Sequence, residues 1–162
     1  MAKTRIAVAG AGIIGLAHIE VTQKSPTCRL TAIVDPAPAS VATAARVGVP
    51  LYRSLDELFA KDRPEGVILA TPNQLHLEHA LKCIEAGVPM LLEKPITPTV
   101  REGEALIRAA DKAAAKVLIG HHRAHSPIMG RGSPAARRST SEADNRSSDT
   151  RRAHTRASPW TA

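Results

Sequence analysis

The stretch Ile6-Ala7-Val8-Ala9-Gly10-Ala11-Gly12-Ile13-Ile14-Gly15 decides the fold of this chain. Its first four residues predict a buried strand, and its glycines have the spacing G-x-G-x-x-G ahead of a helix pattern. In such a turn Gly10 permits the tight bend, and Gly12 lets bare backbone approach a diphosphate. Gly15 lets the helix pack close to the strand. We expect the N–H groups that open the helix, around Ile13-Ile14, to hold the phosphates.

An acidic residue completes this pattern. Asp35 follows Gly15 by twenty residues and closes a second apolar run, Leu30–Val34. A carboxylate there would bind the ribose 2′-hydroxyl of a dinucleotide and repel a 2′-phosphate, and the next residues, Pro36-Ala37-Pro38, offer no arginine to receive one. The sequence therefore predicts a dinucleotide site and favours NAD over NADP. The alternative is an ordinary glycine loop, which the flanking strand, helix and acid disfavour.

Strand and helix patterns alternate up to about residue 120. We expect strands at 5–9, 30–34, 50–53, 66–70, 88–92 and 117–120, and helices between them. Ser54-Leu55-Asp56-Glu57 and Thr99-Val100-Arg101-Glu102 have the form of capping boxes, and Gly48 and Gly87 are placed to end helices. This alternation predicts an α/β fold, a doubly wound parallel Rossmann sheet of six strands in the order 3-2-1-4-5-6.

Polar residues follow several of these strands. Thr71-Pro72-Asn73, with His76, comes after the fourth strand, Glu93-Lys94-Pro95 after the fifth, and His121-His122-Arg123 after the sixth. Because the carboxyl ends of parallel strands share one edge, these segments should converge around the cofactor crevice. Each has a plainer interpretation: Asn73 as a helix N-cap, His76 and His79 as surface histidines, and Lys94 as an exposed lysine.

These motifs, in this order, resemble the glucose–fructose oxidoreductase and inositol dehydrogenase family (Gfo/Idh/MocA) over roughly residues 4–128. The resemblance implies an NAD(P)-dependent oxidoreductase acting by hydride transfer on a sugar, cyclitol or related alcohol. It also implies that Lys94 contacts substrate and nicotinamide, with Glu93 and Pro95 setting its geometry. A lysine there could orient the hydroxyl and stabilise alkoxide charge. The expected cofactor contacts are Gly10, Gly12, Ile13, Ile14, Gly15, Asp35, Thr71, Pro72, Asn73, His76, Glu93, Lys94 and Pro95.

The chain departs from that family after residue 129. We expect a cofactor-binding domain over 1–122 and the start of a substrate domain over 123–129. Residues 130–162 contain no Leu, Ile, Val, Met, Phe or Tyr, so we expect a disordered basic tail, either genuine or the product of an out-of-frame read-through. We therefore expect the family's second domain to be missing, and the alternative function is a dinucleotide-binding fragment without independent catalytic activity.

Charge and composition restrict the partners. The formal net charge is +7, and seven of the 22 basic residues lie in residues 130–162 with only three acids. Nucleic-acid binding is not expected, because acids interleave the arginines there. We expect no metal site, since the chain's histidines lack further ligands at suitable spacing. Two separated cysteines and the lack of a long apolar run predict a cytoplasmic protein without a membrane anchor. A homo-oligomer is compatible with the sequence.

Overall fold

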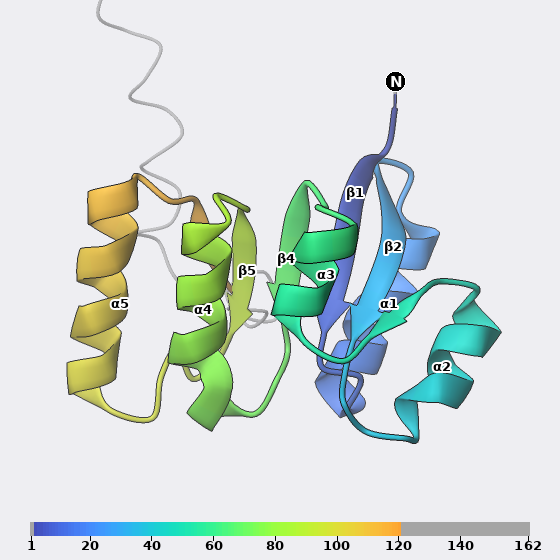
Figure 1. Ribbon diagram of the computed structural model, residues 1–162, viewed down its shortest axis with the longest axis horizontal. Coiled ribbons are helices and arrows are strands. Elements are labelled where there is room, and N and C mark those ends of the chain that lie inside the picture. Colours follow the sequence, from blue (N-terminus) through green and yellow to red (C-terminus); the bar gives the residue numbers. More distant parts are fainter. Residues whose placement is uncertain (1, 121–162) are drawn as a thin grey trace, which may run out of the picture. The chain divides into compact units, whose positions relative to one another are not determined.

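The strand before the glycine turn forms the centre of a parallel sheet. The computed structural model describes residues 2–120. In it β1 (Thr4–Ala9) lies between β2 (Cys28–Val34) and β4 (Gly66–Leu69), as Figure 1 shows. With β3 (Leu51–Tyr52), β5 (Met90–Glu93) and β6 (Val117–Gly120), the order is β3-β2-β1-β4-β5-β6, and all paired strands are parallel. The predicted doubly wound α/β sheet is confirmed. The predicted segments 123–129 and 130–162 lie outside the described residues.

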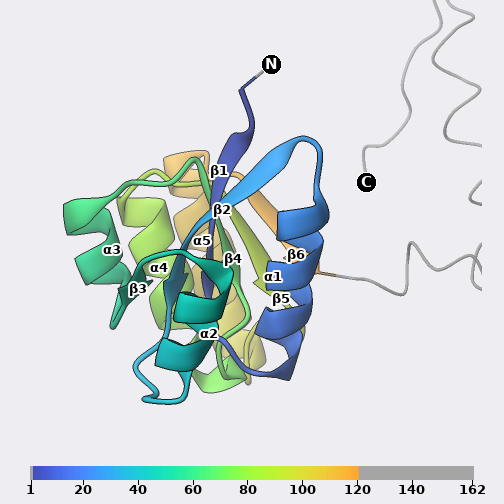
Figure 2. The same ribbon diagram turned by 90° about the vertical axis from the view of Figure 1, so that its right-hand side faces the viewer.

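Helices cover the two faces of this sheet unequally. Figure 2 shows α1 (Ile13–Lys24) on the opposite side of the sheet from α3 (Leu55–Lys61) and α4 (His76–Glu85). The larger core cluster joins Leu58 of α3, Ala80 of α4 and Leu106 of α5 (Val100–Ala113) to strand residues. The smaller cluster contains Val8, Ile19, Ile33 and Ala44, and so places α1 and α2 (Ser40–Val47) over β1 and β2.

Local signals set most helix boundaries as predicted. The Ser54 hydroxyl accepts the Glu57 N–H at 3.1 Å, and Thr99 with Glu102 forms a full capping box at the start of α5. Gly48 ends α2 with a φ of 77°, in the left-handed region that favours glycine. These contacts satisfy helix-end groups that would otherwise have no hydrogen-bond partner.

Several expectations are wrong in detail. The fifth strand, expected at 88–92, is Met90–Glu93, and the third, expected at 50–53, is Leu51–Tyr52. The second strand begins at Cys28 rather than at residue 30, because its early residues pair with β1 across a register shift between Ile6 and Ala7. Asn73 is not a side-chain cap: it opens a short 3-10 turn, η1 (Asn73–Leu75), and neither this turn nor α4 has a side-chain cap. The backbone after Pro72 tightens before α4 begins, which moves Asn73 away from the cap position.

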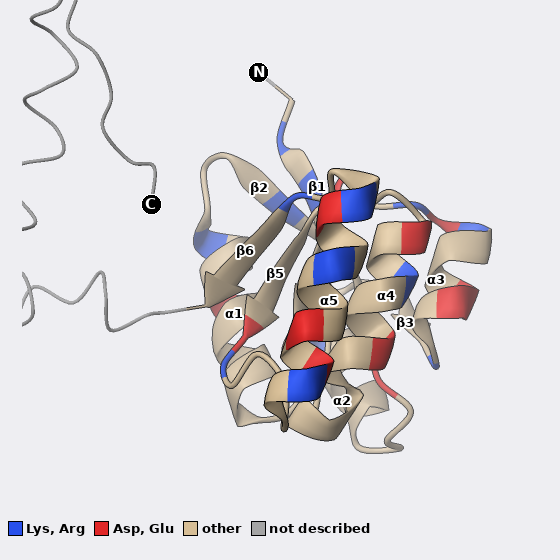
Figure 3. Cartoon of the chain, turned by 90° about the vertical axis from the view of Figure 1, so that its left-hand side faces the viewer, with Lys and Arg blue, Asp and Glu red and all other residues tan. Residues whose placement is uncertain are grey.

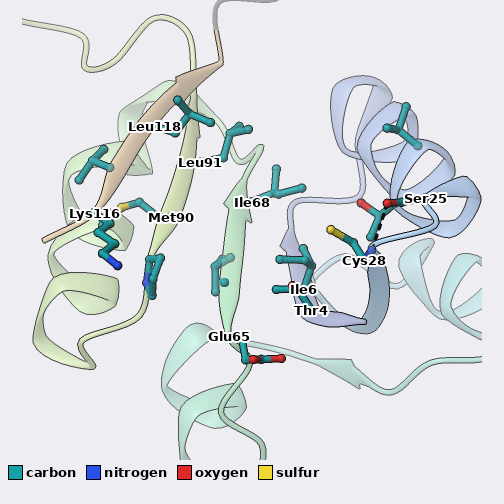
Figure 4. A pocket seen from close by; sticks show the side chains of 16 residues that line it. Thr4, Ile6, Ser25, Cys28, Glu65, Ile68, Met90, Leu91, Lys116 and Leu118 are labelled. Atoms are coloured by element: carbon teal, nitrogen blue, oxygen red, sulfur yellow. Dashed lines mark hydrogen bonds between the residues drawn. The ribbon is translucent and has the colours of Figure 1, made fainter. Parts of the chain in front are cut away.

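One face of β4, β5 and β6 carries apolar side chains over a hollow. Successive residues of a strand point to opposite faces, so Val67 and Leu69 enter the larger core while Ile68 points the other way. Leu91 and Leu118 take the matching positions on β5 and β6, and Leu118 is 64% exposed. Figure 4 shows these side chains around a hollow of about 540 Å³. Among residues 2–120, no helix fills this hollow.

Charged side chains are distributed over the outer helices. Figure 3 shows Lys, Arg, Asp and Glu on the outward faces of α4 and α5, while β5 and β6 are mostly uncharged. Within the part of the chain that the structure describes, no helix combines the length and apolarity needed to cross a bilayer. The same residues contain no cluster of three His, Cys, Asp or Glu side chains suited to a metal ion. His121, His122 and Arg123 lie beyond the described residues.

Candidate functional site

The glycine turn after β1 is shaped by two close backbone contacts. Gly10 has a φ of 90°, and its N–H donates to the Val34 carbonyl at 2.8 Å. A Cβ at Gly10 would overlap the Ala70 carbonyl at the end of β4, and a Cβ at Gly15 would overlap the Gly10 carbonyl. Both glycines are therefore required for the chain to turn tightly between β1 and α1.

Gly12 differs from both, because its surroundings are open. A Cβ at Gly12 would meet no atom within 4 Å, although the residue has an ordinary φ of −73° and is the N-cap of α1. No side chain caps this helix, and no acidic residue lies in its first turn. The first N–H groups of a helix have no partner within it, so these donors are available to an anion. Ile13 is 88% exposed, which leaves an apolar surface beside these donors.

Asp35 lies directly across this turn. Its Oδ2 accepts the Ala11 N–H at 2.7 Å and its Oδ1 accepts the Ala37 N–H at 2.8 Å. The carboxylate thus joins the glycine turn to the loop after β2. Each carboxylate oxygen has a second lone pair that a ribose hydroxyl could use. The predicted position of the acid at the strand end is therefore compatible with dinucleotide binding.

These residues border a pocket of about 620 Å³ at the carboxyl ends of β1, β2 and β4. This is the point where the strand order reverses, and ligands of open α/β sheets bind there. The predicted residues that line it are Gly10, Gly12, Ile13, Ile14, Asp35, Thr71 and Pro72. The pocket is open beside Gly12, where a Cβ would meet no atom within 4 Å.

Several further residues line this pocket, and two of them, Arg53 and His79, bring polar side chains that the sequence patterns did not assign to it. Arg53, from the loop between β3 and α3, donates to the Pro36 carbonyl at 2.8 Å and brings a cation beside Asp35. His79 is half-buried rather than a plain surface residue, and its Nδ1 lies 3.1 Å from the Thr71 hydroxyl. Burial lowers the pKa of His79, an effect that Lys82 reinforces and Glu78 opposes. The pairing of separate strands, which leaves no local sequence signal, brings both residues to the site.

His76 does not line this pocket. Only 1% of it is exposed, and its Nδ1 lies 2.8 Å from the Pro95 carbonyl while its Nε2 lies 2.9 Å from the Thr71 carbonyl. The ring therefore joins the segment after β4 to the segment after β5. Any contribution of His76 to cofactor binding acts through these two backbones.

The Glu93-Lys94-Pro95 segment follows β5 on the same edge of the sheet. Lys94 is exposed, and the peptide bond between Lys94 and Pro95 is cis. The buried Glu93 carboxylate points to α1, where its Oε1 lies 2.8 Å from the Nε2 atom of His18. Asn73, Glu93, Lys94 and Pro95 stand outside the lining of the pocket between β1, β2 and β4. Their predicted contacts with the cofactor therefore remain predictions, at the sheet edge that follows β4 and β5.

Comparison with known proteins agrees with this arrangement. Residues 4–121 match the family model for an oxidoreductase family with an NAD-binding Rossmann fold. The rhizopine catabolism protein MocA of Rhizobium meliloti is 28% identical over 129 residues, which are 80% of this chain and 41% of that protein. The inositol 2-dehydrogenase of Corynebacterium glutamicum (strain R) is 31% identical over 111 residues, 67% of this chain and 33% of the enzyme.

A solved structure of a dehydrogenase also resembles this chain. The WlbA dehydrogenase of Bordetella pertussis, crystallised with NADH and UDP-GlcNAcA, has a TM-score of 0.69 and 28% identity, over 73% of this chain and 37% of that one. The chain thus spans about two fifths or less of the relatives that it matches. The matched part includes the glycine turn, Asp35 and the Lys94 segment. This chain belongs to the Gfo/Idh/MocA family of oxidoreductases and contains that family's NAD-binding Rossmann domain.

Proposed function

We propose that this chain binds NAD along the carboxyl edge of its sheet and serves hydride transfer with a sugar, cyclitol or related alcohol. The observation that carries the proposal is the uncapped start of α1. The start of α1 lines a pocket that Asp35 also lines, and a Cβ at Gly12 would meet no atom within 4 Å there. A diphosphate fits these donors by charge and by space.

The two ends of the cofactor would meet different residues. Asp35 and the loop after β2 would hold the adenosine ribose, and the glycine turn the diphosphate. The strand order then directs the nicotinamide toward β4 and β5, where Thr71 and Lys94 lie. NAD is the hydride acceptor in this scheme. The chain's own contribution is to bind it and to hold Lys94 beside the alcohol.

Lys94 would act on the hydroxyl group. Its ammonium can donate a hydrogen bond to the alcohol oxygen and stabilise the negative charge that develops there as the hydroxyl proton passes to solvent and the hydride passes to NAD. His76 supports this role, because it fixes the Pro95 carbonyl beside the lysine to the Thr71 carbonyl across the crevice.

Cofactor choice follows from two opposed charges. The Asp35 carboxylate would repel a 2′-phosphate, which favours NAD. Arg53 lies in the same pocket and could receive a 2′-phosphate if the carboxylate were removed. We propose NAD as the natural cofactor because both Asp35 oxygens already accept backbone N–H groups, which holds the carboxylate at the ribose position.

Two free cysteines bear on location. Cys28 is half-buried, Cys83 is buried, and neither is in a disulfide. Free thiols are typical of reducing compartments. We therefore propose a cytoplasmic protein, which cell fractionation would test directly.

Binding and turnover are tested separately. We expect NADH to bind the purified chain, with enhanced cofactor fluorescence or a calorimetric signal, and NAD to be reduced in the presence of a polyol or inositol. Lys94→Ala should abolish turnover and keep binding, whereas Lys112→Ala, an exposed lysine on α5, should change neither. Absence of NADH binding would refute the proposal.

The second candidate function is a cofactor-binding module without turnover. It is favoured by the length of the match, because the chain spans 41% of MocA and 33% of the inositol dehydrogenase. The same experiment separates the two functions. NADH binding without NAD reduction by any alcohol in the panel would support the module and exclude independent catalysis.

A further inference from the structure

A hydrogen-bonded pair, half-buried His18 and buried Glu93, joins α1 to the end of β5. Glu93 is 7% exposed, so its carboxylate needs partners. Its Oε1 lies 2.8 Å from His18 Nε2, and its Oε2 accepts the backbone N–H of Lys94 at 3.1 Å. One carboxylate therefore contacts both the helix that starts at the glycine turn and the residue proposed to act on the substrate.

The neighbouring strand is shaped to admit this carboxylate. Gly120 of β6 pairs with Glu93, and a Cβ at Gly120 would lie 2.8 Å from Oε1 and 3.2 Å from Oε2. Any side chain there would displace the carboxylate from His18. Gly120 thus provides a second observation that is independent of the hydrogen bond. The Glu93 carboxylate occupies the space that a side chain at position 120 would need.

The charge state of the pair agrees with its geometry. Burial by itself would raise the pKa of Glu93, but the hydrogen bonds from His18 and from the Lys94 N–H outweigh it and hold the pKa below its usual range. Glu93 is therefore ionised at neutral pH and acts as an acceptor for both donors.

The two ends of this link belong to the two halves of the proposed site. His18 is on α1, whose first turn would hold the diphosphate, and Lys94 follows Glu93 directly. The contact spans 75 residues of sequence. A shift of α1 would move His18 and therefore change the position of Glu93 and the Lys94 N–H.

We propose that His18 is a positioning residue that acts through Glu93 to fix Lys94 relative to the diphosphate-binding start of α1. This inference rests on the proposed function and names a residue to which that function assigned no part. His18 is not among the residues that line the pocket, and its side chain hydrogen-bonds Glu93 rather than Lys94, so we expect its effect to pass through the Glu93 carboxylate.

The test compares amide hydrogen exchange at Lys94 in the free chain. In His18→Phe the ring keeps its bulk but loses its donor, so Glu93 becomes mobile and the Lys94 amide exchanges faster by about tenfold, the scale of one hydrogen bond to a charged group. His18→Gln places an amide N–H near the Nε2 position and should restore slow exchange. Glu20→Gln, an exposed carboxylate on α1 that pairs with Lys24, is the matched control and should change nothing.

Coupling is tested by adding Glu93→Ala. Glu93→Ala removes both the contact with His18 and the acceptor of the Lys94 N–H. It should therefore accelerate exchange at Lys94 at least as much as His18→Phe does, and adding His18→Phe to it should give no further acceleration. Should His18→Phe fail to fold, His18→Asn, whose amide is too short to reach Glu93, takes its place. Unchanged Lys94 exchange in the donor-free variant, or failure of His18→Gln to restore it, would overturn the inference.

NADH titrations keep this inference separate from the proposed function. If the wild-type chain binds no NADH, the proposed function fails, while the exchange comparison in the free chain still decides whether His18 positions Lys94. If NADH binds, the NMR signal of the Lys94 amide should shift on binding in wild type and in His18→Gln. The same signal should shift less in His18→Phe. An equal shift in all three would contradict the link.

Discussion

Alanine at Gly12 and at Gly15 should separate cofactor binding from folding. Both residues belong to the glycine turn, yet a Cβ at Gly12 meets no atom within 4 Å, whereas a Cβ at Gly15 overlaps the Gly10 carbonyl. The two substitutions add the same methyl group within four residues of each other. Gly12→Ala should nevertheless affect mainly NADH binding, whereas Gly15→Ala should affect mainly the stability of the fold.

Gly12→Ala should leave the free energy of unfolding within about 0.5 kcal/mol of wild type. Alanine accepts the φ of −73° found there and restricts the unfolded chain, a gain of roughly 0.4–1 kcal/mol. Alanine is a poorer N-cap than glycine, which offsets most of that gain. The added Cβ occupies the approach to the α1 N–H groups, so NADH should lose a charge-assisted hydrogen bond. That loss of roughly 1.5–3 kcal/mol corresponds to a Kd raised about 10- to 100-fold.

Gly15→Ala should instead destabilise the fold. Replacing glycine inside a helix gains about 1 kcal/mol in helix propensity. The overlap with backbone atoms forces α1 away from β1, and strain of this kind in a packed interior costs typically about 1–3 kcal/mol or more. We expect a net loss of about 2 kcal/mol, together with weaker NADH binding.

Urea denaturation followed by circular dichroism measures stability, and calorimetric titration with NADH measures binding. Wild-type NADH affinity in Gly12→Ala would refute the assignment of this turn to the diphosphate. Wild-type stability in Gly15→Ala would refute the packing of α1 against the turn.

Three further predictions concern single side chains. Asp35→Ser should weaken NADH binding about tenfold, because a hydrogen bond to a charged group is lost. The same substitution should strengthen NADPH binding, because Arg53 remains in the pocket. An unchanged ratio of the Kd for NADH to the Kd for NADPH would contradict this prediction. Burial raises the pKa of the Cys83 thiol to about 12, so iodoacetamide at pH 8 should modify Cys28 alone in the native chain and both thiols in urea, as mass spectrometry would show. The pKa of Glu93 is lower in the folded chain than its ordinary value of 4.5. The ionised carboxylate therefore stabilises the folded state fully above pH 4.5, and this stabilisation is lost as the pH falls through the lower pKa of the folded chain. Glu93→Gln should therefore lose less stability than wild type between pH 7 and pH 3 in urea denaturation, and an equal loss would count against the ionised pair.

The sequence predicted the fold well where local physics decides it. Helix α1 begins at Ile13 and ends at Lys24 as expected, and the two capping motifs at Ser54 and Thr99 form the expected hydrogen bonds. Apolar periodicity identified the six strands, with shifts of about two residues at their ends. Those shifts arise where register with a neighbouring strand, rather than propensity, sets the boundary.

The candidate site was less predictable. Motifs pointed to the glycine turn, Asp35 and Lys94, because chain order and strand ends imply one shared edge. They did not show that His76 is buried between the Thr71 and Pro95 carbonyls, that His79 contacts Thr71, or that Asn73 caps no helix. Each of these depends on the direction in which a side chain leaves its backbone, which neighbouring elements decide.

The sequence by itself determined the alternation of strands and helices and the glycine turn, because these depend on residues close together in the chain, and it placed Asp35 at the end of the second strand. Only the tertiary structure decided that His18 meets Glu93 and that Arg53 enters the Asp35 pocket. Those contacts join residues of separate elements, and a contact across the fold exists only once the strands have paired and the helices have packed. The periodicity of apolar residues and the spacing of motifs indicate local structure, but they do not indicate contacts between separate elements.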